Sequence, residues 1–117
     1  MDSIVHELHL HPEVFELIKN GSKNIEMRLN DDKRKNMKIG DVIRFTKRFT
    51  EPVEKLDVKI IDRREFSNFS ELIDNYEMKQ LYFENYTKDE LLNELCRFYS
   101  IEEQNNNGVV AFEFEIL

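Results

Sequence analysis

Cysteine, glycine and proline are all scarce in this 117-residue chain, and each shortage narrows the possible folds. A single cysteine, Cys96, rules out an internal disulfide, so we expect a domain held by its core in a reducing cytoplasm. No apolar run approaches the roughly 20 residues that span a bilayer. The first residues also lack the basic-then-apolar layout of a secretion signal. We therefore expect neither a membrane-spanning nor a secreted protein.

The chain does contain enough apolar side chains for a core. Hydrophobic residues make up 40% of it, including nine Phe and four Tyr, which indicates a folded protein rather than disorder. A chain of this length suits one domain, spanning residues 1–117, with one modest core.

Negative charge dominates, with a formal net charge of −7, but it is unevenly distributed. Residues 19–64 contain fourteen Lys or Arg against eight Asp or Glu, whereas residues 65–117 contain three against twelve. The basic segment could bind an anion locally, because exposed charges are screened beyond about 10 Å at moderate salt. It could equally be a solvated face, which is the reading that charge alone favours.

Apolar and polar residues alternate, then follow a helical period, and then alternate again in the first third of the chain. Residues 4–10 alternate as a strand. Pro12 fits the first turn of a helix, and Gly21 stands where such a helix ends. Residues 24–29 form the next predicted strand, with apolar side chains on one face and polar ones on the other.

A hairpin and a closing strand are predicted in the rest of the sequence. Residues 42–48 and 55–65 read as two strands joined by a turn around Glu51-Pro52. The last strand begins near Val109, after a loop at residues 104–108.

Two helices are expected between the hairpin and the last strand. Ser70 can cap a helix that runs to about Gln80. Thr87 and Glu90 form a capping box, which opens a second helix with an apolar stripe. The predicted order belongs to the α+β class. Five short strands with intermittent helices suit a small barrel or half-barrel of about five to six strands, whose closure would hide sheet edges.

The first candidate site combines Lys23, Glu26 and Arg28. Residues two apart on a strand lie about 6.5–7 Å apart on one face, so Glu26 and Arg28 can project into one groove that Lys23 could also reach. A carboxylate and a guanidinium there could hold a nucleobase or a phosphate. The alternative is a surface ion pair, worth about 0–1 kcal/mol.

Histidine and cysteine provide weaker candidates. His9 and His11 share a strand face, but neither a nearby cysteine nor a third ligand at fixed spacing supports a metal site, and we predict none. His6 is expected to be a hydrogen-bonded core residue. Cys96 has no evident base beside it, so we expect a buried structural thiol.

Two further segments carry candidate binding residues. The hairpin is rich in Lys and Arg, including Arg44 and Arg48, and could follow a phosphate backbone or be a solvated ribbon. Glu84 and Tyr86 come just before the capped helix, where an acid can either favour the helix N-terminus or point into a pocket.

These motifs together resemble the ASCH family. The segment LIKNGSKNIEMR resembles the family's G-x-K-x-x-E-x-R signature, with Gly21, Lys23, Glu26 and Arg28 in the signature positions. The segment MKIGDVIRF is similar to the Gly-Asp strand entry that follows it. The resemblance is strongest over residues 6–45, and among its branches a bacterial and phage one looks most similar. It implies a PUA-like β-barrel with a cleft between barrel and helices, and a function in binding RNA or modified bases.

The resemblance also implies possible enzymes. One branch looks like an amidohydrolase that deacetylates N4-acetylcytidine with a Lys, a Thr and a Glu; Lys23 and Glu84 match two of these, but Glu26 stands at the Thr position. A carboxylate beside a lysine keeps it charged, so Glu26 would have to act as a general base on water instead. Ribonuclease activity, with Lys23 and Glu84 or Tyr86, is a further implied possibility.

From the residues and the resemblance we expect a cleft that binds RNA or a nucleotide-like ligand without a cofactor. The expected binding residues are Lys23, Glu26, Arg28, Arg44, Arg48 and Tyr86, and the candidate catalytic residues are Lys23, Glu26 and Glu84. Two alternatives remain open: a small hydrolase on nucleic-acid substrates, and a protein-interaction module that uses the acidic helices.

Overall fold

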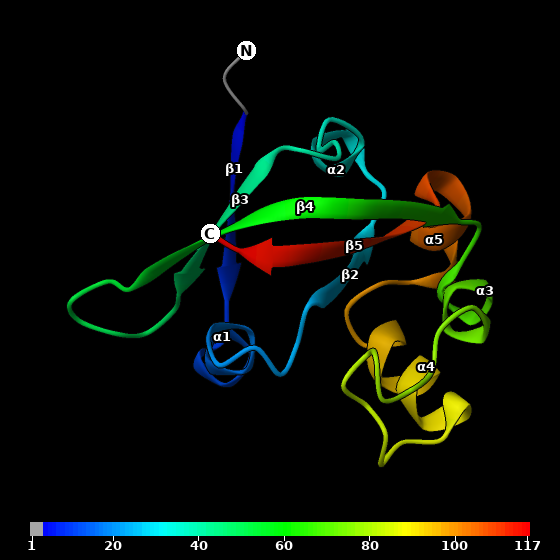
Figure 1. Cartoon of the computed structure of the whole chain (residues 1–117). Helices are drawn as coiled ribbons and strands as arrows, with labels where there is room; N and C mark the ends of the chain where they lie inside the picture. The colour runs from blue at the N-terminus through cyan, green and yellow to red at the C-terminus, as the bar shows by residue number, and fades with distance from the viewer. Residues whose placement is uncertain (1–3) are drawn as a thin grey trace.

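A computed structural model describes residues 4–117 of the chain, which form five strands and five helices in that range. One five-stranded sheet, in the order β1-β3-β4-β5-β2, curls into a half-barrel (Figure 1). The strands are β1 (Val5–Leu10), β2 (Ile25–Leu29), β3 (Val42–Lys47), β4 (Lys55–Phe66) and β5 (Val109–Ile116). The predicted α+β class and PUA-like small barrel are confirmed.

The long strand β4 connects the two halves of the sheet. Residues 55–59 pair antiparallel with β3, as the predicted hairpin requires, and residues 58–66 pair antiparallel with β5. The β4–β5 register shifts between Ile60 and Asp62, and such a bulge bends a strand and increases its twist. Strand β1 runs parallel to β3 and forms one edge, while β2 pairs with β5 and forms the other.

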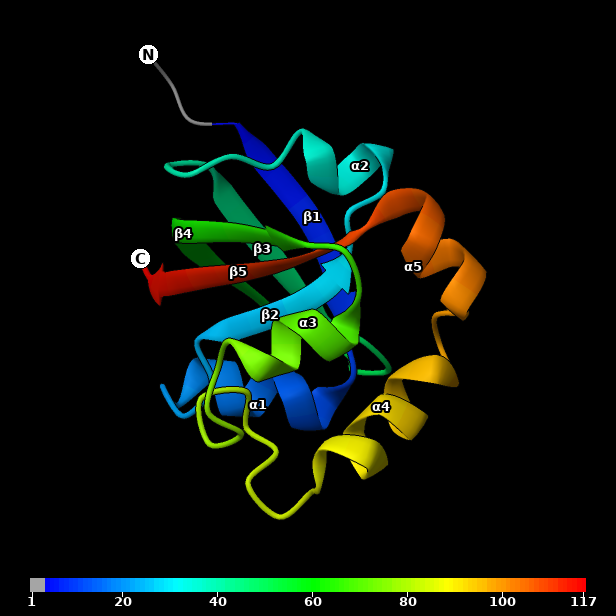
Figure 2. The ribbon, with the colours of Figure 1, turned by 90° about the vertical axis from the view of Figure 1, so that its right-hand side faces the viewer.

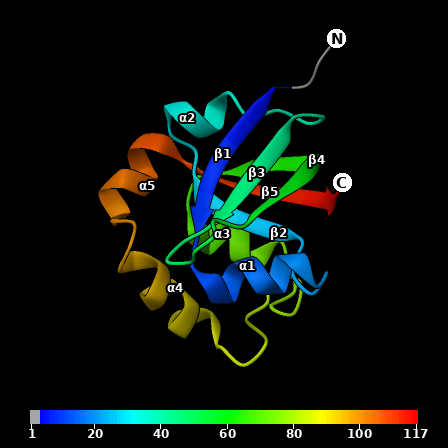
Figure 3. The same cartoon turned by 90° about the vertical axis from the view of Figure 1, so that its left-hand side faces the viewer.

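Helices α1 (Pro12–Lys19) and α2 (Asp32–Lys35) belong to the first half of the chain. Pro12 occupies the first turn of α1 as predicted, and Gly21, at φ +84°, ends the segment in a conformation that favours glycine. In Figure 3, α1 lies across the end of the half-barrel below β1 and β3. The short helix α2 lies in the connection between β2 and β3, where the Asp31 side chain caps it by accepting a hydrogen bond from the backbone N–H of Arg34.

The second-half helices, α3 (Phe69–Asp74), α4 (Lys88–Cys96) and α5 (Ile101–Asn107), differ in part from the prediction. Asn68, not Ser70, caps α3, which ends at Asp74 rather than near Gln80. The residues expected to form a loop at 104–108 are mostly α5, which Ser100 opens with a second capping box. The capping box at Thr87 is present as predicted. Gly108 then turns the chain at φ +70°, where a Cβ would lie 3.0 Å from the carbonyl oxygen of Phe66.

The first half of β5 is buried on both faces, each against a different core. Val110, Phe112 and Phe114 face the barrel interior, whereas Val109 and Ala111 face the helices. Figure 2 shows α3 in front of β2, with α4 and α5 beside it. On β2, the apolar side chains pack toward these helices, so Glu26 and Arg28 project to the barrel face. Among the described residues, no helix has the length and apolar character needed to cross a membrane.

Candidate functional site

A cavity of about 520 Å³ lies where the half-barrel does not close. Both edge strands line it, β1 with His9 and Leu10 and β2 with Glu26, Met27 and Arg28. The other lining residues are His11, Val14, Leu17, Lys23, Arg48, Tyr82, Phe83, Leu95, Phe98 and Tyr99. We call this the first cavity. It therefore joins residues from the barrel, from α1 and from the helical half of the chain.

The register of β2 against β5 buries the Glu26 carboxylate in this cavity. Glu26 lies opposite Phe112 on the barrel face, and its side chain is 12% exposed. The backbone N–H of Met27 donates to Oε1 over 3.2 Å. The second oxygen, Oε2, is buried and has no hydrogen-bond partner among the described residues. Its cationic neighbour, Arg28 Nη2, lies 3.9 Å away, beyond hydrogen-bonding distance.

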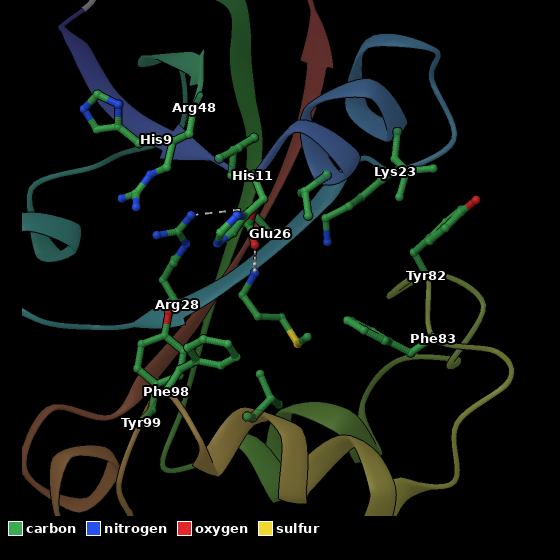
Figure 4. A pocket seen from close by; sticks show the side chains of 15 residues that line it. His9, His11, Lys23, Glu26, Arg28, Arg48, Tyr82, Phe83, Phe98 and Tyr99 are labelled. Atoms are coloured by element: carbon green, nitrogen blue, oxygen red, sulfur yellow. Dashed lines mark hydrogen bonds and ion pairs between the residues drawn. The ribbon is translucent and has the colours of Figure 1, made fainter. Parts of the chain in front are cut away.

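Lys23 adds a second charged side chain to the same cavity. Its backbone N–H donates to the Leu17 carbonyl over 3.0 Å, which fixes the chain just after α1. The residue is only 7% exposed. Within residues 4–117, no carboxylate lies within 4 Å of its Nζ atom. Figure 4 shows the Lys23 and Glu26 side chains pointing into the middle of the cavity.

The two ends of the cavity differ in chemistry. Arg28, Arg48 and His9 lie at one end, and Tyr82 and Phe83 lie at the other (Figure 4). Arg48 is exposed and has no ion-pair partner in the described part of the chain. The cavity therefore combines a cationic end, a mixed-charge centre and an aromatic end.

Tyr99 adds a polar group to the floor of the cavity. Burial raises the pKa of the Tyr99 phenol, although the nearby Arg28 guanidinium opposes the shift. The centroid of its ring lies 5.4 Å from that of Phe69. This contact packs Tyr99 against the helical core. A phenol with a raised pKa stays protonated at neutral pH, so Tyr99 can donate a hydrogen bond.

Glu84 and Tyr86 do not line the first cavity, contrary to the expectation of a single cleft. They line a neighbouring cavity of about 360 Å³, the second cavity, together with Ser22, Lys79, Tyr82, Phe83 and Asn85. The chain turns after Phe83, where the Tyr86 N–H donates to the Phe83 carbonyl over 2.9 Å. Residues 84–86 follow this turn and line the second cavity but not the first. The structure thus gathers Lys23, Glu26 and Arg28, while Glu84 lies beyond an aromatic wall.

Most cations of the hairpin already have partners. Arg44 makes a bidentate contact with Asp57, at 2.9 and 3.1 Å, because the β3–β4 register sets the two residues opposite each other. Lys47 donates to Glu16 over 2.7 Å, and Arg64 lies over the rings of Phe66 and Tyr76. Of the two hairpin arginines predicted to bind ligand, Arg48 lines the first cavity and Arg44 lies in neither.

The histidines and the cysteine take separate positions. His6 is partly buried, and its Nε2 lies 2.8 Å from Asp41 Oδ2, as expected of a hydrogen-bonded core histidine. Burial acts to raise the pKa of Asp41, but the hydrogen bonds from His6 and from the Lys38 N–H outweigh it, so this pKa lies below its usual value. His9 and His11 line the first cavity. Cys96 is exposed rather than buried, because α4 turns its apolar stripe, and not Cys96, toward the core.

Sequence reasoning missed the aromatic lining. Tyr82 and Phe83 lie in the segment that was singled out for Glu84 and Tyr86, directly before those residues. Phe98 and Tyr99 follow α4 and reach the cavity from its end. The sequence signal was the density of aromatic residues around a capped helix. That density does not indicate whether the side chains point into a cavity or into the core.

Comparison with known proteins agrees with this architecture. The family model described as "ASCH domain" matches residues 8–117. The crystal structure of hypothetical protein PH0355 is 33% identical, with a TM-score of 0.83, and the match covers 97% of this chain and 100% of that one. The solution structure of protein PF0455 from Pyrococcus furiosus is also 33% identical, with a TM-score of 0.76, covering 97% and 98%. Comparison with curated proteins gives no match.

The family match agrees with the signature at Gly21, Lys23, Glu26 and Arg28, all of which lie within the matched range. ASCH domains have a PUA-like fold, which is associated with RNA binding. The match and the fold cover nearly the whole described chain. This chain therefore belongs to the ASCH domain family.

Proposed function

We propose that this protein binds RNA through one nucleotide whose base enters the first cavity. The observation that carries the proposal is the pair of buried, opposite charges on Lys23 and Glu26, neither of which has a hydrogen-bonded ion-pair partner among the described residues. Charges in a buried setting carry a desolvation cost that is offset only when hydrogen bonds satisfy them. Native proteins keep few such groups, and those that remain call for a functional explanation.

A nucleobase would satisfy both charges at once. The Glu26 carboxylate lines the cavity and can accept a hydrogen bond from an exocyclic amino group, and the Lys23 ammonium can donate to a ring carbonyl. Cytosine and guanine carry both groups, whereas uracil lacks the amino group and adenine lacks the carbonyl. The mixed-charge centre therefore favours cytosine, guanine or modified bases that keep these two groups.

The two ends of the cavity suit the rest of a nucleotide. Tyr82 and Phe83 present aromatic surface at one end, and base stacking on such side chains contributes about 1–3 kcal/mol per base. Arg48, exposed and without an ion-pair partner in the described chain, can contact a phosphate at the other end. This replaces the expected phosphate track along the hairpin with a single contact at its end.

The test is calorimetric titration of the protein with the four ribonucleoside 5′-monophosphates and with a single-stranded RNA hexamer. We expect CMP or GMP to bind at least tenfold more tightly than UMP and AMP. Lys23→Met and Glu26→Gln should each weaken that binding at least tenfold. Lys55→Met and Glu115→Gln, which alter exposed charges on β4 and β5, serve as matched controls and should leave it unchanged.

Equal binding of all four nucleotides, or binding that survives both cavity substitutions, would overturn the proposal. Recovery of a stoichiometric protein partner in place of RNA would favour the protein-interaction alternative instead.

Incubation with N4-acetylcytidine and with mixed RNA tests the hydrolase alternative. We expect no turnover, because Glu26 replaces the threonine nucleophile implied by the family resemblance and Glu84 lies in the neighbouring cavity. Hydrolysis that disappears in Lys23→Met would instead assign this protein as an enzyme.

A further inference from the structure

The second cavity lies directly beside the first and shares a wall with it. Tyr82 and Phe83 line both cavities. Ser22, on the rim of the second, immediately precedes Lys23, which lines the first. The two cavities thus adjoin at these two aromatic residues.

The shared wall is held in an uncommon backbone conformation. Tyr82 has φ +64°, a region that bulky side chains rarely adopt and that costs of order 1–3 kcal/mol. Two turn hydrogen bonds fix it: the Tyr82 N–H donates to Lys79 over 3.1 Å, and the Phe83 N–H donates to Met78 over 2.9 Å. The Tyr82 side chain remains 45% exposed. These two hydrogen bonds are those of a Schellman turn, which accounts for the left-handed conformation and fixes the position of the Tyr82 ring that lines both cavities.

The second cavity has its own stacking surface and its own charges. Tyr86 is 40% exposed, and its ring meets that of Phe83 edge-on at 5.3 Å. Lys79 and Glu84 are exposed, and neither makes an ion pair within residues 4–117. An aromatic face, a free ammonium and a free carboxylate can respectively stack a base, contact a phosphate and accept a hydrogen bond from a base amino group or a 2′-hydroxyl.

We propose that the second cavity binds the nucleotide next to the one in the first cavity, with the Tyr82–Phe83 wall between the two bases. The ligand is then a single strand of at least two nucleotides rather than a free nucleoside. This inference rests on the proposed function of the first cavity, but it assigns a separate set of residues. Tyr86 and Lys79 belong to the second cavity alone.

Competition experiments against a fluorescein-labelled RNA hexamer test the inference. The competitors are the four ribonucleoside 5′-monophosphates and an equimolar pool of the sixteen 5′-phosphorylated ribodinucleotides. We expect the dinucleotide pool to compete at least tenfold better than the best mononucleotide. In Tyr86→Ala this advantage should fall to less than threefold, while the affinity for the mononucleotide stays within twofold.

Tyr86→Phe is the matched control, because it keeps the stacking ring and removes only the hydroxyl, so it should retain the dinucleotide advantage. Lys79→Ala should weaken binding of the dinucleotide pool a few-fold and leave the affinity for the mononucleotides unchanged. The unchanged mononucleotide affinity also verifies that each variant is folded around the first cavity.

Dinucleotides that bind no more tightly than mononucleotides would overturn the second site and leave the first intact. A dinucleotide advantage that persists in Tyr86→Ala would do the same. Failure of every nucleotide to bind, or a nucleotide affinity that is unchanged in Lys23→Met, would instead reject the proposed function itself. The two failures are therefore distinguishable.

Discussion

Two pairs of oppositely charged residues have contrasting surroundings, one on the β3–β4 hairpin and one in the first cavity. Arg44 and Asp57 lie across the β3–β4 hairpin, partly exposed, and each satisfies the other through two hydrogen bonds. Lys23 and Glu26 are buried at the open edge of the half-barrel, and within the described chain no ion-pair partner lies within hydrogen-bonding distance of either. The hydrogen bonds within the Arg44–Asp57 pair are sufficient to account for it as part of the surface. The second costs stability, so a ligand that satisfies it is the physical reason to keep it.

The largest effect expected from this contrast is a gain in stability on removal of the buried charges. Lys23→Met combined with Glu26→Gln should raise the free energy of unfolding by about 1–3 kcal/mol, because neutral side chains of similar size avoid the desolvation cost. Urea denaturation followed by circular dichroism measures the change. The same variant should lose nucleotide binding.

The control for this variant is Lys55→Met with Glu115→Gln, which neutralises the same two charges at exposed positions. It should leave the unfolding midpoint nearly unchanged. A fall in stability in the cavity variant, with the control unaffected, would show that the two buried charges support each other, and the contrast would disappear.

A smaller effect is expected at the His6–Asp41 pair, which is partly buried but satisfied. Asp41→Asn should lower the free energy of unfolding by about 1 kcal/mol at pH 7, since a hydrogen bond to a charged group is lost. The pKa of Asp41 is lowered in the folded protein, so its contribution is complete above the unfolded pKa, near 4, and is lost as the pH falls through the folded pKa.

Urea unfolding of Asp41→Asn and the wild type at pH 7, 5 and 3 checks this prediction. Between pH 5 and 3 the difference between the two proteins should shrink. A difference that grows over this range would contradict the sign of the pKa shift.

The contrast between the two pairs was only partly visible in the sequence. Alternation placed Glu26 and Arg28 on one face of a strand, and the register confirms that placement. It did not show that this face is buried, because burial depends on β2 pairing with β5, which is about 85 residues away along the chain. Local pattern therefore gave the direction of these side chains but not their surroundings.

Two segments of the chain have the same capping-box signal, but only the one at Thr87 was predicted to open a helix. Ser100 and Glu103 have the same S/T-x-x-E spacing as Thr87 and Glu90, and both form complete capping boxes. The run of asparagines after Ser100 favoured a loop, yet the cap and the burial of Gln104, which accepts a hydrogen bond from the Phe69 N–H, stabilise a helix there. The position of Glu84 could not be predicted, because residues 75–86 follow turns without any period.

The exposed arginine of the first cavity gives a third prediction, which concerns binding rather than folding. Arg48→Ala should weaken binding of the RNA hexamer a few-fold and lower the slope of log K against log salt by about 1, since one phosphate contact is lost. Anisotropy titrations between 50 and 300 mM NaCl, about the range where such slopes are linear, measure it. Arg44→Ala is the matched control, and an equal loss of slope there would place the RNA along the hairpin after all.

The smallest effect should come from the satisfied surface pair. Arg44→Met combined with Asp57→Asn removes both charges of a pair that lies partly in solvent, where such pairs contribute little and are screened by salt. We expect the unfolding midpoint to stay within the scatter of replicate melts at moderate salt, and nucleotide binding to be unchanged. The two double variants then differ only in where the charges lie. Similar gains in stability from both would mean that burial at the half-barrel opening has no special cost, whereas a gain confined to the Lys23 and Glu26 variant ties that cost to the cavity.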